Sequence, residues 1–222
     1  MDWTALFLSL QLAGWTVVIL LPVSVLTGRW LAYRQFGAKG LVEGLVMLPL
    51  VLPPTVFGYY LLVGFGRNSP VGGLWQTLFG HQLVFSFEGL VVASVIFNLP
   101  FAIQPAQRGF EAIAVEVREA AACCGMSSWR SLWRIELPLA WPGLMTAMVL
   151  TFAHTIGEFG IVLMVGGSIP GETKTIAIAI YDRVQAFDEA AAGTMAAVLV
   201  AISLLTISAT FWLSARVGRR LT

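Results

Sequence analysis

The sequence is poor in charged residues. Asp, Glu, Lys and Arg make up only 11% of its 222 residues, whereas hydrophobic residues make up 58%. Because a soluble domain carries about 25% charged residues, this chain could not cover a water-exposed surface, and we expect membrane lipid to surround most of it. The net charge of +1 also gives no reason to expect a nucleic-acid partner.

Residues that bind metals or act as nucleophiles are scarce as well. The only cysteines, Cys123 and Cys124, are adjacent, and the only histidines are His81 and His154. A zinc site needs three or four ligands at suitable spacing, and the sequence has no G-x-S-x-G motif of a serine hydrolase. We therefore predict no metal site and no catalytic residue. This disfavours a membrane-embedded enzyme and leaves a transporter or a non-transporting scaffold.

A nucleotide-binding motif is also missing. The chain has only two lysines, Lys39 and Lys174, and neither lies in the G-x-x-x-x-G-K-[ST] spacing of a phosphate-binding loop. If the protein takes part in ATP-driven transport, ATP and Mg²⁺ must therefore be bound by a separate subunit and not by this chain.

Long uncharged windows are what the sequence has in abundance. A membrane-crossing helix needs about 20 apolar residues, so we predict an all-α integral membrane protein that forms a single domain over residues 1–222. The first window lacks the basic start of a signal peptide, and we expect it to be a retained span. Residues 68–87 are too polar for a span and are expected to form a loop with a short interfacial piece, while 175–187 should lie as an amphipathic segment at the membrane surface. The five predicted spans are about 5–27, 44–66, 88–107, 138–165 and 190–214.

The positions of the basic residues predict how the chain is oriented. Lys and Arg are retained mostly on the cytoplasmic side of membrane proteins. With the N-terminus outside, ten of the 13 Lys and Arg residues fall in cytoplasmic segments, including Arg216, Arg219 and Arg220. The reverse orientation would invert this bias, so we predict an external N-terminus and a cytoplasmic C-terminus.

The cytoplasmic connection at 108–137 carries the most specific pattern. Its first part can form a short helix in which Ile113, Val117, Ala120 and Cys124 share one face. Gly125 should end that helix, and Ser127 or Ser128 can cap a second one. On this second helix Trp129 and Trp133 are four residues apart, and so are Arg130 and Arg134. Composition alone would make the connection a linker at the headgroup level of the membrane.

The order of residues in this connection resembles the EAA loop of ABC importer permeases. That loop reads Glu-Ala-Ala, three residues, Gly, nine residues, Ile-x-Leu-Pro. The matching positions are Glu119, Ala120, Ala121, Gly125, Ile135, Leu137 and Pro138. The resemblance implies a type I ABC importer permease fold in which this loop couples to an ATPase. It further implies a homodimer of this chain, two ATPase subunits and an extracytoplasmic binding protein that delivers the substrate.

Other segments are similar to molybdate permeases. They are LPLVLPPTV at 48–56 with Gly58-Tyr59, GEFG at 157–160, and IPGETKTI at 169–176. The resemblance covers about residues 5–215 and implies that the chain carries molybdate across the cytoplasmic (inner) membrane. Tungstate and sulfate remain alternatives, although sulfate permeases are usually longer and have another span.

Prolines in the second predicted span indicate a break. Pro49, Pro53 and Pro54 cannot all lie in an unbroken helix, and a broken span is tolerated only where protein or water meets the freed backbone groups. We therefore predict that Pro53, Pro54 and Thr55 line or gate the translocation path, with Gly58 on the same segment and backbone N–H groups facing an oxyanion. A kink that only shapes packing is an equal alternative.

Glu158 is the least expected residue of the fourth predicted span. At 1.5 Å per residue it lies about 30 Å beyond Pro138, near the outer edge of the membrane. His154 is one turn earlier on the same face, so the two side chains could share a proton. Because a carboxylate would repel a dianion, we expect Glu158 to have a structural or gate-holding role instead of binding the substrate.

Overall fold

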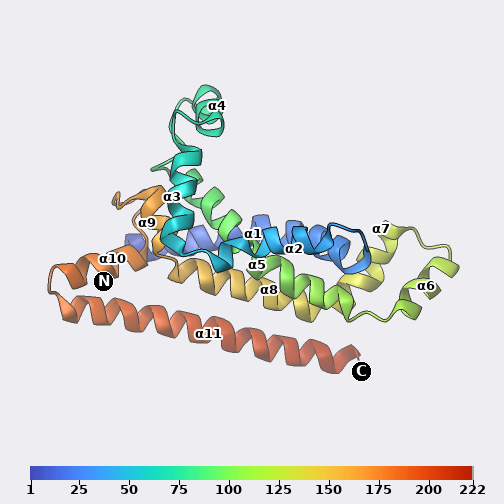
Figure 1. Ribbon diagram of the computed structural model, residues 1–222. Coiled ribbons are helices and arrows are strands. Elements are labelled where there is room, and N and C mark those ends of the chain that lie inside the picture. Colours follow the sequence, from blue (N-terminus) through green and yellow to red (C-terminus); the bar gives the residue numbers. More distant parts are fainter. Residues whose placement is uncertain (222) are drawn as a thin grey trace.

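The computed structural model describes the backbone of residues 1–221 and the side chains of residues 1–208, and this part of the chain contains helices and no strand (Figure 1). Arg216, Arg219, Arg220 and the end of the last predicted span therefore lie outside the described side chains. The elements are α1 (Trp3–Tyr33), α2 (Lys39–Val51), α3 (Pro54–Phe65), α4 (Pro70–Phe79), α5 (Phe87–Glu111), α6 (Val115–Cys123), α7 (Ser128–Ser131), the π-helical turn η1 (Leu132–Glu136), α8 (Leu137–Gly157), α9 (Gly160–Gly166), α10 (Ile176–Gln185) and α11 (Glu189–Leu221).

Three long helices, α1, α5 and α8, lie side by side and form the centre of the molecule (Figure 1). Small residues let them approach closely. A Cβ atom on Gly143 of α8 would lie 2.6 Å from the carbonyl oxygen of Pro105 and 2.7 Å from the Cα atom of Gly109 in α5. Helices that meet at such short range gain dispersion contacts that lipid cannot replace.

The number of apolar helices in the described residues agrees with the five predicted spans if one bent pair of helices counts as a single span. By length and composition, four helical segments in the described residues can cross a membrane: α1, α5, the continuous stretch 128–157, and the described part of α11. The pair α2 and α3 counts as a fifth span if it is taken together, although it is bent by 107°. The bend falls at Leu52 and Pro53, where the prolines predicted a break.

The fourth predicted span, 138–165, is not one helix. α8 ends at Gly157, and α9 begins only at Gly160. Between them Glu158 has an extended backbone with φ −68° and ψ 127°. Apolar composition alone favoured a continuous helix, but the Glu158 side chain accepts a hydrogen bond from the backbone of α9 and thereby starts a new helix.

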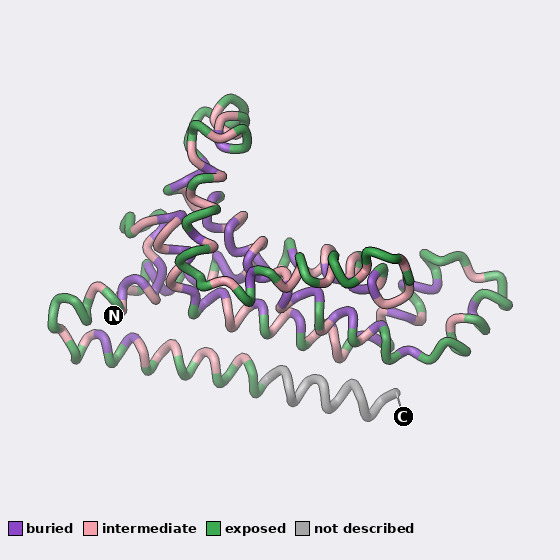
Figure 2. The backbone as a smooth tube through the Cα atoms, viewed as in Figure 1, coloured by how far each residue is buried: buried purple, intermediate pink, exposed green. Residues whose placement is uncertain are grey.

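The stretches 68–87 and 175–187, which were not predicted to span the membrane, each contain a helix. In the stretch 68–87, α4 begins at a Ser69 cap and stands apart from the bundle with much of its surface exposed (Figure 2). In the stretch 175–187, α10 is amphipathic as predicted. However, Ile176 and Ala179 pack with residues of α1 and α11, so protein and not lipid covers the apolar face.

Candidate functional site

Two helix breaks meet in the structure, one between α2 and α3 and the other between α8 and α9. About 100 residues separate them in sequence. A Cβ atom on Gly160, at the start of α9, would lie 2.9 Å from Cβ of Pro54, the first residue of α3. One turn further along, a Cβ atom on Gly58 would lie 2.9 Å from Cβ of Met164. The structure thus brings Pro54, Gly58 and the Gly-Glu-Phe-Gly segment together, whereas Gly157 has no neighbour within 4 Å of such an atom.

The first break is open on one side. Pro53, Pro54 and Thr55 are exposed, while Gly58 is buried against α9. The backbone N–H groups of Val56 and Phe57 both donate to the carbonyl oxygen of Pro53, at 2.9 and 3.0 Å. These two N–H donors are therefore already engaged within the first turn of α3 and do not face outward as free donors.

The second break is built around Glu158. Its carboxylate is buried, and Oε1 accepts a hydrogen bond from the backbone N–H of Ile161 at 3.2 Å. A negative charge at the first turn of a helix is stabilised by the free N–H groups and the helix dipole. This contact fits the structural role that the sequence favours for Glu158.

His154 has a different partner from the one predicted. Its Nδ1 lies 3.0 Å from Oδ1 of Asn98 in α5 but 4.0 Å from Oε2 of Glu158, which is too long for a hydrogen bond. Its ring also stacks on Phe101, with 4.1 Å between the ring centroids. His154 therefore joins α8 to α5 and does not share a hydrogen bond with Glu158.

At the other end of the bundle, α6 and α7 form the helix–turn–helix that the sequence predicts. Gly125 has φ +72°, and the N–H of Met126 donates to the carbonyl of Ala121 at 3.1 Å, which is the Schellman ending of a helix. Ser127 then caps α7 by accepting from the N–H of Arg130. Both the turn and the cap are therefore confirmed.

Of the four residues predicted to share one face of the first short helix, Ile113 lies before the helix begins. The other three, Val117, Ala120 and Cys124, are exposed. Ala121 is the buried residue of α6. Of the Glu-Ala-Ala triplet, the first two residues therefore face outward and only the third packs inward.

A partly buried ion pair ties the last residues of the connection to α1. The Arg29 guanidinium donates from Nε to Glu136 Oε2 at 2.5 Å and from Nη2 to Glu136 Oε1 at 3.0 Å. The same carboxylate accepts from the Ser131 hydroxyl at 2.9 Å, and Arg29 Nη2 also donates to Ser128. Two parallel bonds of this kind fix both position and orientation.

The helix α6 is linked to α1 by a second arginine. The guanidinium carbon of Arg118 lies 3.9 Å from the centroid of the Tyr33 ring, within the range of a cation–π contact. Sequence reasoning missed this contact and the pair of Arg29 with Glu136. The only signal for them was that Glu136, Arg29 and Arg118 all fall on the same predicted side of the membrane.

Comparison with known proteins decides the family. Residues 21–222 match the family described as "Binding-protein-dependent transport system inner membrane component". The chain belongs to this family. It is a multi-pass inner-membrane component of a transport system, and its apolar helices agree with that assignment.

Relatives of this permease include two proteins that are named for molybdenum transport. Over 210 residues it is 46% identical to the molybdenum transport system permease protein ModB of Azotobacter vinelandii, covering 95% of this chain and 93% of the relative. It is 35% identical over 219 residues to the protein of the same name from Escherichia coli K12, covering 98% and 95%. A sulfate transport system permease, CysW of Synechococcus elongatus, is 31% identical over 207 residues, which cover 91% of this chain and 72% of that relative.

Solved structures show the fold. A bacterial ABC transporter involved in the import of the polysaccharide alginate superposes with a TM-score of 0.78 at 16% identity, over 96% of this chain and 78% of that chain. A second structure of an alginate ABC transporter, in complex with a periplasmic protein, gives 0.76 at 17% identity over the same shares. The ABC importer permease fold predicted from the sequence is thus confirmed.

Proposed function

We propose that this permease carries molybdate into the cytoplasm by alternating access, driven by ATP that a separate subunit hydrolyses. The strongest support is the similarity to proteins named for molybdenum transport, which extends over almost the whole of both chains. The sulfate relative is less similar and is longer than this chain. The five-span length of the chain also agrees with a molybdate permease.

The meeting of the two helix breaks is the proposed gate of the path. Pro53, Pro54 and Thr55 expose the first break, and Gly58 allows α9 to lie directly against α3. Glu158 holds the second break by capping α9, and His154 anchors the preceding helix to Asn98. In this proposal α3 and α9 move together, because Gly58 and Gly160 let the two helices pack closely against each other.

The proposed contact with the ATPase is made by α6. Glu119 and Ala120 are exposed, and a small side chain at Ala120 would let a partner approach the backbone of α6. Ala121 and the left-handed Gly125 hold the helix and its turn in place. The remaining motif residues, Ile135, Leu137 and Pro138, lie at the junction of η1 and α8.

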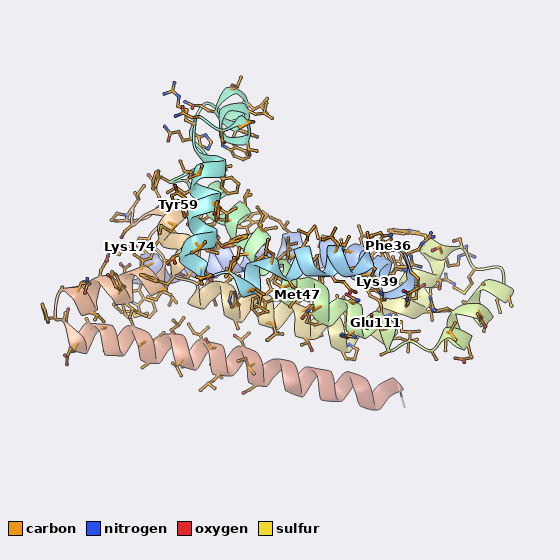
Figure 3. The ribbon with its side chains drawn as sticks, in the orientation of Figure 1. Phe36, Lys39, Met47, Tyr59, Glu111 and Lys174 are labelled. Carbon is orange, nitrogen blue, oxygen red and sulfur yellow. The ribbon has the colours of Figure 1, made fainter. Side chains whose placement is uncertain are left out.

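The proposed assembly is a homodimer of this chain with two ATPase subunits, which bind ATP and Mg²⁺, and one extracytoplasmic binding protein. The N-terminus would lie outside. In Figure 3, Lys174 and Tyr59 lie at one end of the bundle and Lys39 and Glu111 at the other. The end near Glu111 also carries α6 (Figure 1) and most of the basic residues that predict the cytoplasmic side.

Uptake into proteoliposomes tests the substrate. The permease is reconstituted with its ATPase and binding protein, and uptake of molybdate is measured alone and against equal concentrations of tungstate or sulfate. We expect ATP-dependent uptake of molybdate that tungstate competes for and sulfate does not. Uptake of sulfate but not of molybdate would contradict the proposed substrate and keep the importer.

A further inference from the structure

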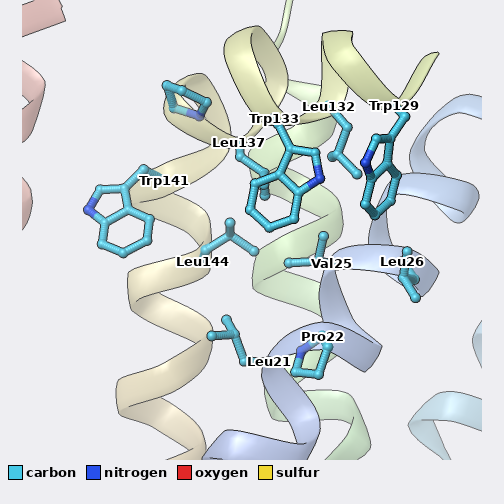
Figure 4. A pocket seen from close by; sticks show the side chains of 11 residues that line it. Leu21, Pro22, Val25, Leu26, Trp129, Leu132, Trp133, Leu137, Trp141 and Leu144 are labelled. Atoms are coloured by element: carbon cyan, nitrogen blue, oxygen red, sulfur yellow. The ribbon is translucent and has the colours of Figure 1, made fainter. Parts of the chain in front are cut away.

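An apolar groove with a volume of about 500 Å³ runs between α1 and the stretch formed by α7, η1 and α8 (Figure 4). All the residues that line it are apolar. Leu21 and Leu26 lie on the side formed by α1, and Leu144 on α8 lies at the end opposite Trp129. From Trp129 to Leu144 the helical stretch is about 22 Å long at 1.5 Å per residue. The stretch that lines the groove is therefore long enough to lie along an extended hydrocarbon chain.

Two tryptophans lie at one end of this groove. Figure 4 shows the indoles of Trp129 and Trp133 on the same side of the helix as Leu132, which faces the α1 residues. Their side chains are exposed, and their rings meet edge to face with 5.7 Å between the centroids. Because tryptophan is enriched where hydrocarbon meets the headgroups, this end of the groove is expected to lie at the membrane interface.

Positive charge lies beside the tryptophans. Arg130 and Arg134 directly follow them in sequence and are exposed, and neither forms an ion pair with any of the described side chains. The nearby Arg29 is different, because its Nε and Nη2 atoms donate hydrogen bonds to Glu136 and Ser128. A guanidinium group can bind two phosphate oxygens at once, and basic sites beside membrane helices recognise anionic headgroups.

We propose that this groove is a binding site for an anionic phospholipid. One acyl chain lies along the groove from Trp133 towards Leu144, and the phosphate is bound by Arg130 and Arg134. The lipid joins α1 to the helices that follow α6 and so supports the position of α6. This proposal does not depend on which anion the permease transports.

Native mass spectrometry of the assembled transporter tests the site. The detergent-solubilised complex is titrated with phosphatidylglycerol or phosphatidylcholine that carry the same acyl chains. We expect phosphatidylglycerol to bind about tenfold more tightly. The double variant R130Q/R134Q should bind both lipids equally, and the matched double variant R67Q/R183Q, which removes two arginines elsewhere, should keep the preference.

A second variant separates the groove from the charges. Leu26→Trp places a large ring in the groove at an exposed position, so it should weaken binding of both lipids and leave the arginines intact. Equal binding of the two lipids by the unchanged protein, or a preference that survives in R130Q/R134Q, would overturn the proposal. So would absence of bound lipid together with a dimer that dissociates in Leu26→Trp, because the groove would then be an interface between two copies.

Discussion

At the end of the bundle that carries α6, charged side chains join the elements, whereas at the end that carries α3 and α9 glycines let two helices pack closely. Glu136 bonds to Arg29 through two oxygens, and Arg118 stacks on Tyr33. At the other end Gly160 meets Pro54 with no space for a Cβ atom. Charged side chains can exchange partners as helices shift, whereas two helices packed closely through glycine have little room to shift against each other. We infer that one end adjusts during transport and the other moves as a unit.

The largest expected effect is at the surface of α6. Ala120→Trp adds a bulky side chain at an exposed position, so the fold should persist while the ATPase is held away. ATP hydrolysis stimulated by the loaded binding protein should fall at least about tenfold, which corresponds to roughly 1.4 kcal/mol of lost coupling. Val184→Trp, at an exposed position on α10, is the matched control and should keep stimulation within twofold of the unchanged protein, a difference of less than about 0.4 kcal/mol.

The next effect tests the ion pair. Glu136→Gln leaves the Arg29 guanidinium without its charged partner in a largely buried site. Loss of one partner of such a pair costs about 3–5 kcal/mol when both are fully buried. Because the Arg29 side chain is 27% exposed, we expect a loss of about 2 kcal/mol in the free energy of unfolding, measured by thermal unfolding in detergent.

Glu111→Gln is the control for that variant, because it removes the partner of Arg108, whose side chain is 81% exposed. Its cost should stay below about 1 kcal/mol. Equal losses for the two variants would show that the pair of Arg29 with Glu136 has no special structural role.

The contact between the two breaks is tested by adding a single methyl group. Gly160→Ala forces α9 away from Pro54 and should cost about 1–3 kcal/mol, as overpacking does in a tight interior. Gly157→Ala, only three residues away, meets no atom within 4 Å and should be neutral or slightly stabilising. Unfolding temperatures that fall equally for both would contradict the close approach of α3 and α9.

The smallest expected effect concerns the charge of Glu158. Glu158→Gln keeps an oxygen that can accept from the N–H of Ile161, so molybdate uptake should stay within about twofold of the unchanged protein, less than about 0.4 kcal/mol. Glu158→Leu removes the acceptor and should lower stability by about 1 kcal/mol, as loss of a helix cap does. A large loss of uptake in Glu158→Gln would show that the charge itself is needed.

The sequence predicted the elements well but not the contacts between them. Apolar windows predicted the long helices, the prolines predicted the break before Pro54, and Gly125 predicted the turn after α6. The break at Glu158 was missed, because window composition does not register a carboxylate that caps the next helix.

Contacts between distant residues explain the other misses. Arg29 and Glu136 are 107 positions apart, and nothing in either neighbourhood specifies the other. The amphipathic pattern of residues 175–187 was predicted to lie at the membrane surface, but periodicity cannot distinguish a face that meets lipid from one that meets Met195 of α11. His154 was paired with Glu158, whose Oε2 lies 4.0 Å from Nδ1, whereas the hydrogen bond of that nitrogen is with Asn98 of α5.

Anion-dependent ATP hydrolysis tests the central claim most directly. The permease is reconstituted with its ATPase and binding protein, and hydrolysis is measured with molybdate, tungstate, sulfate or no anion. We expect molybdate to stimulate hydrolysis, and we expect this stimulation to be lost in Ala120→Trp and kept in Val184→Trp. If no anion stimulates hydrolysis, or if Ala120→Trp is stimulated as strongly as the unchanged protein, the proposed import and its coupling through α6 are contradicted.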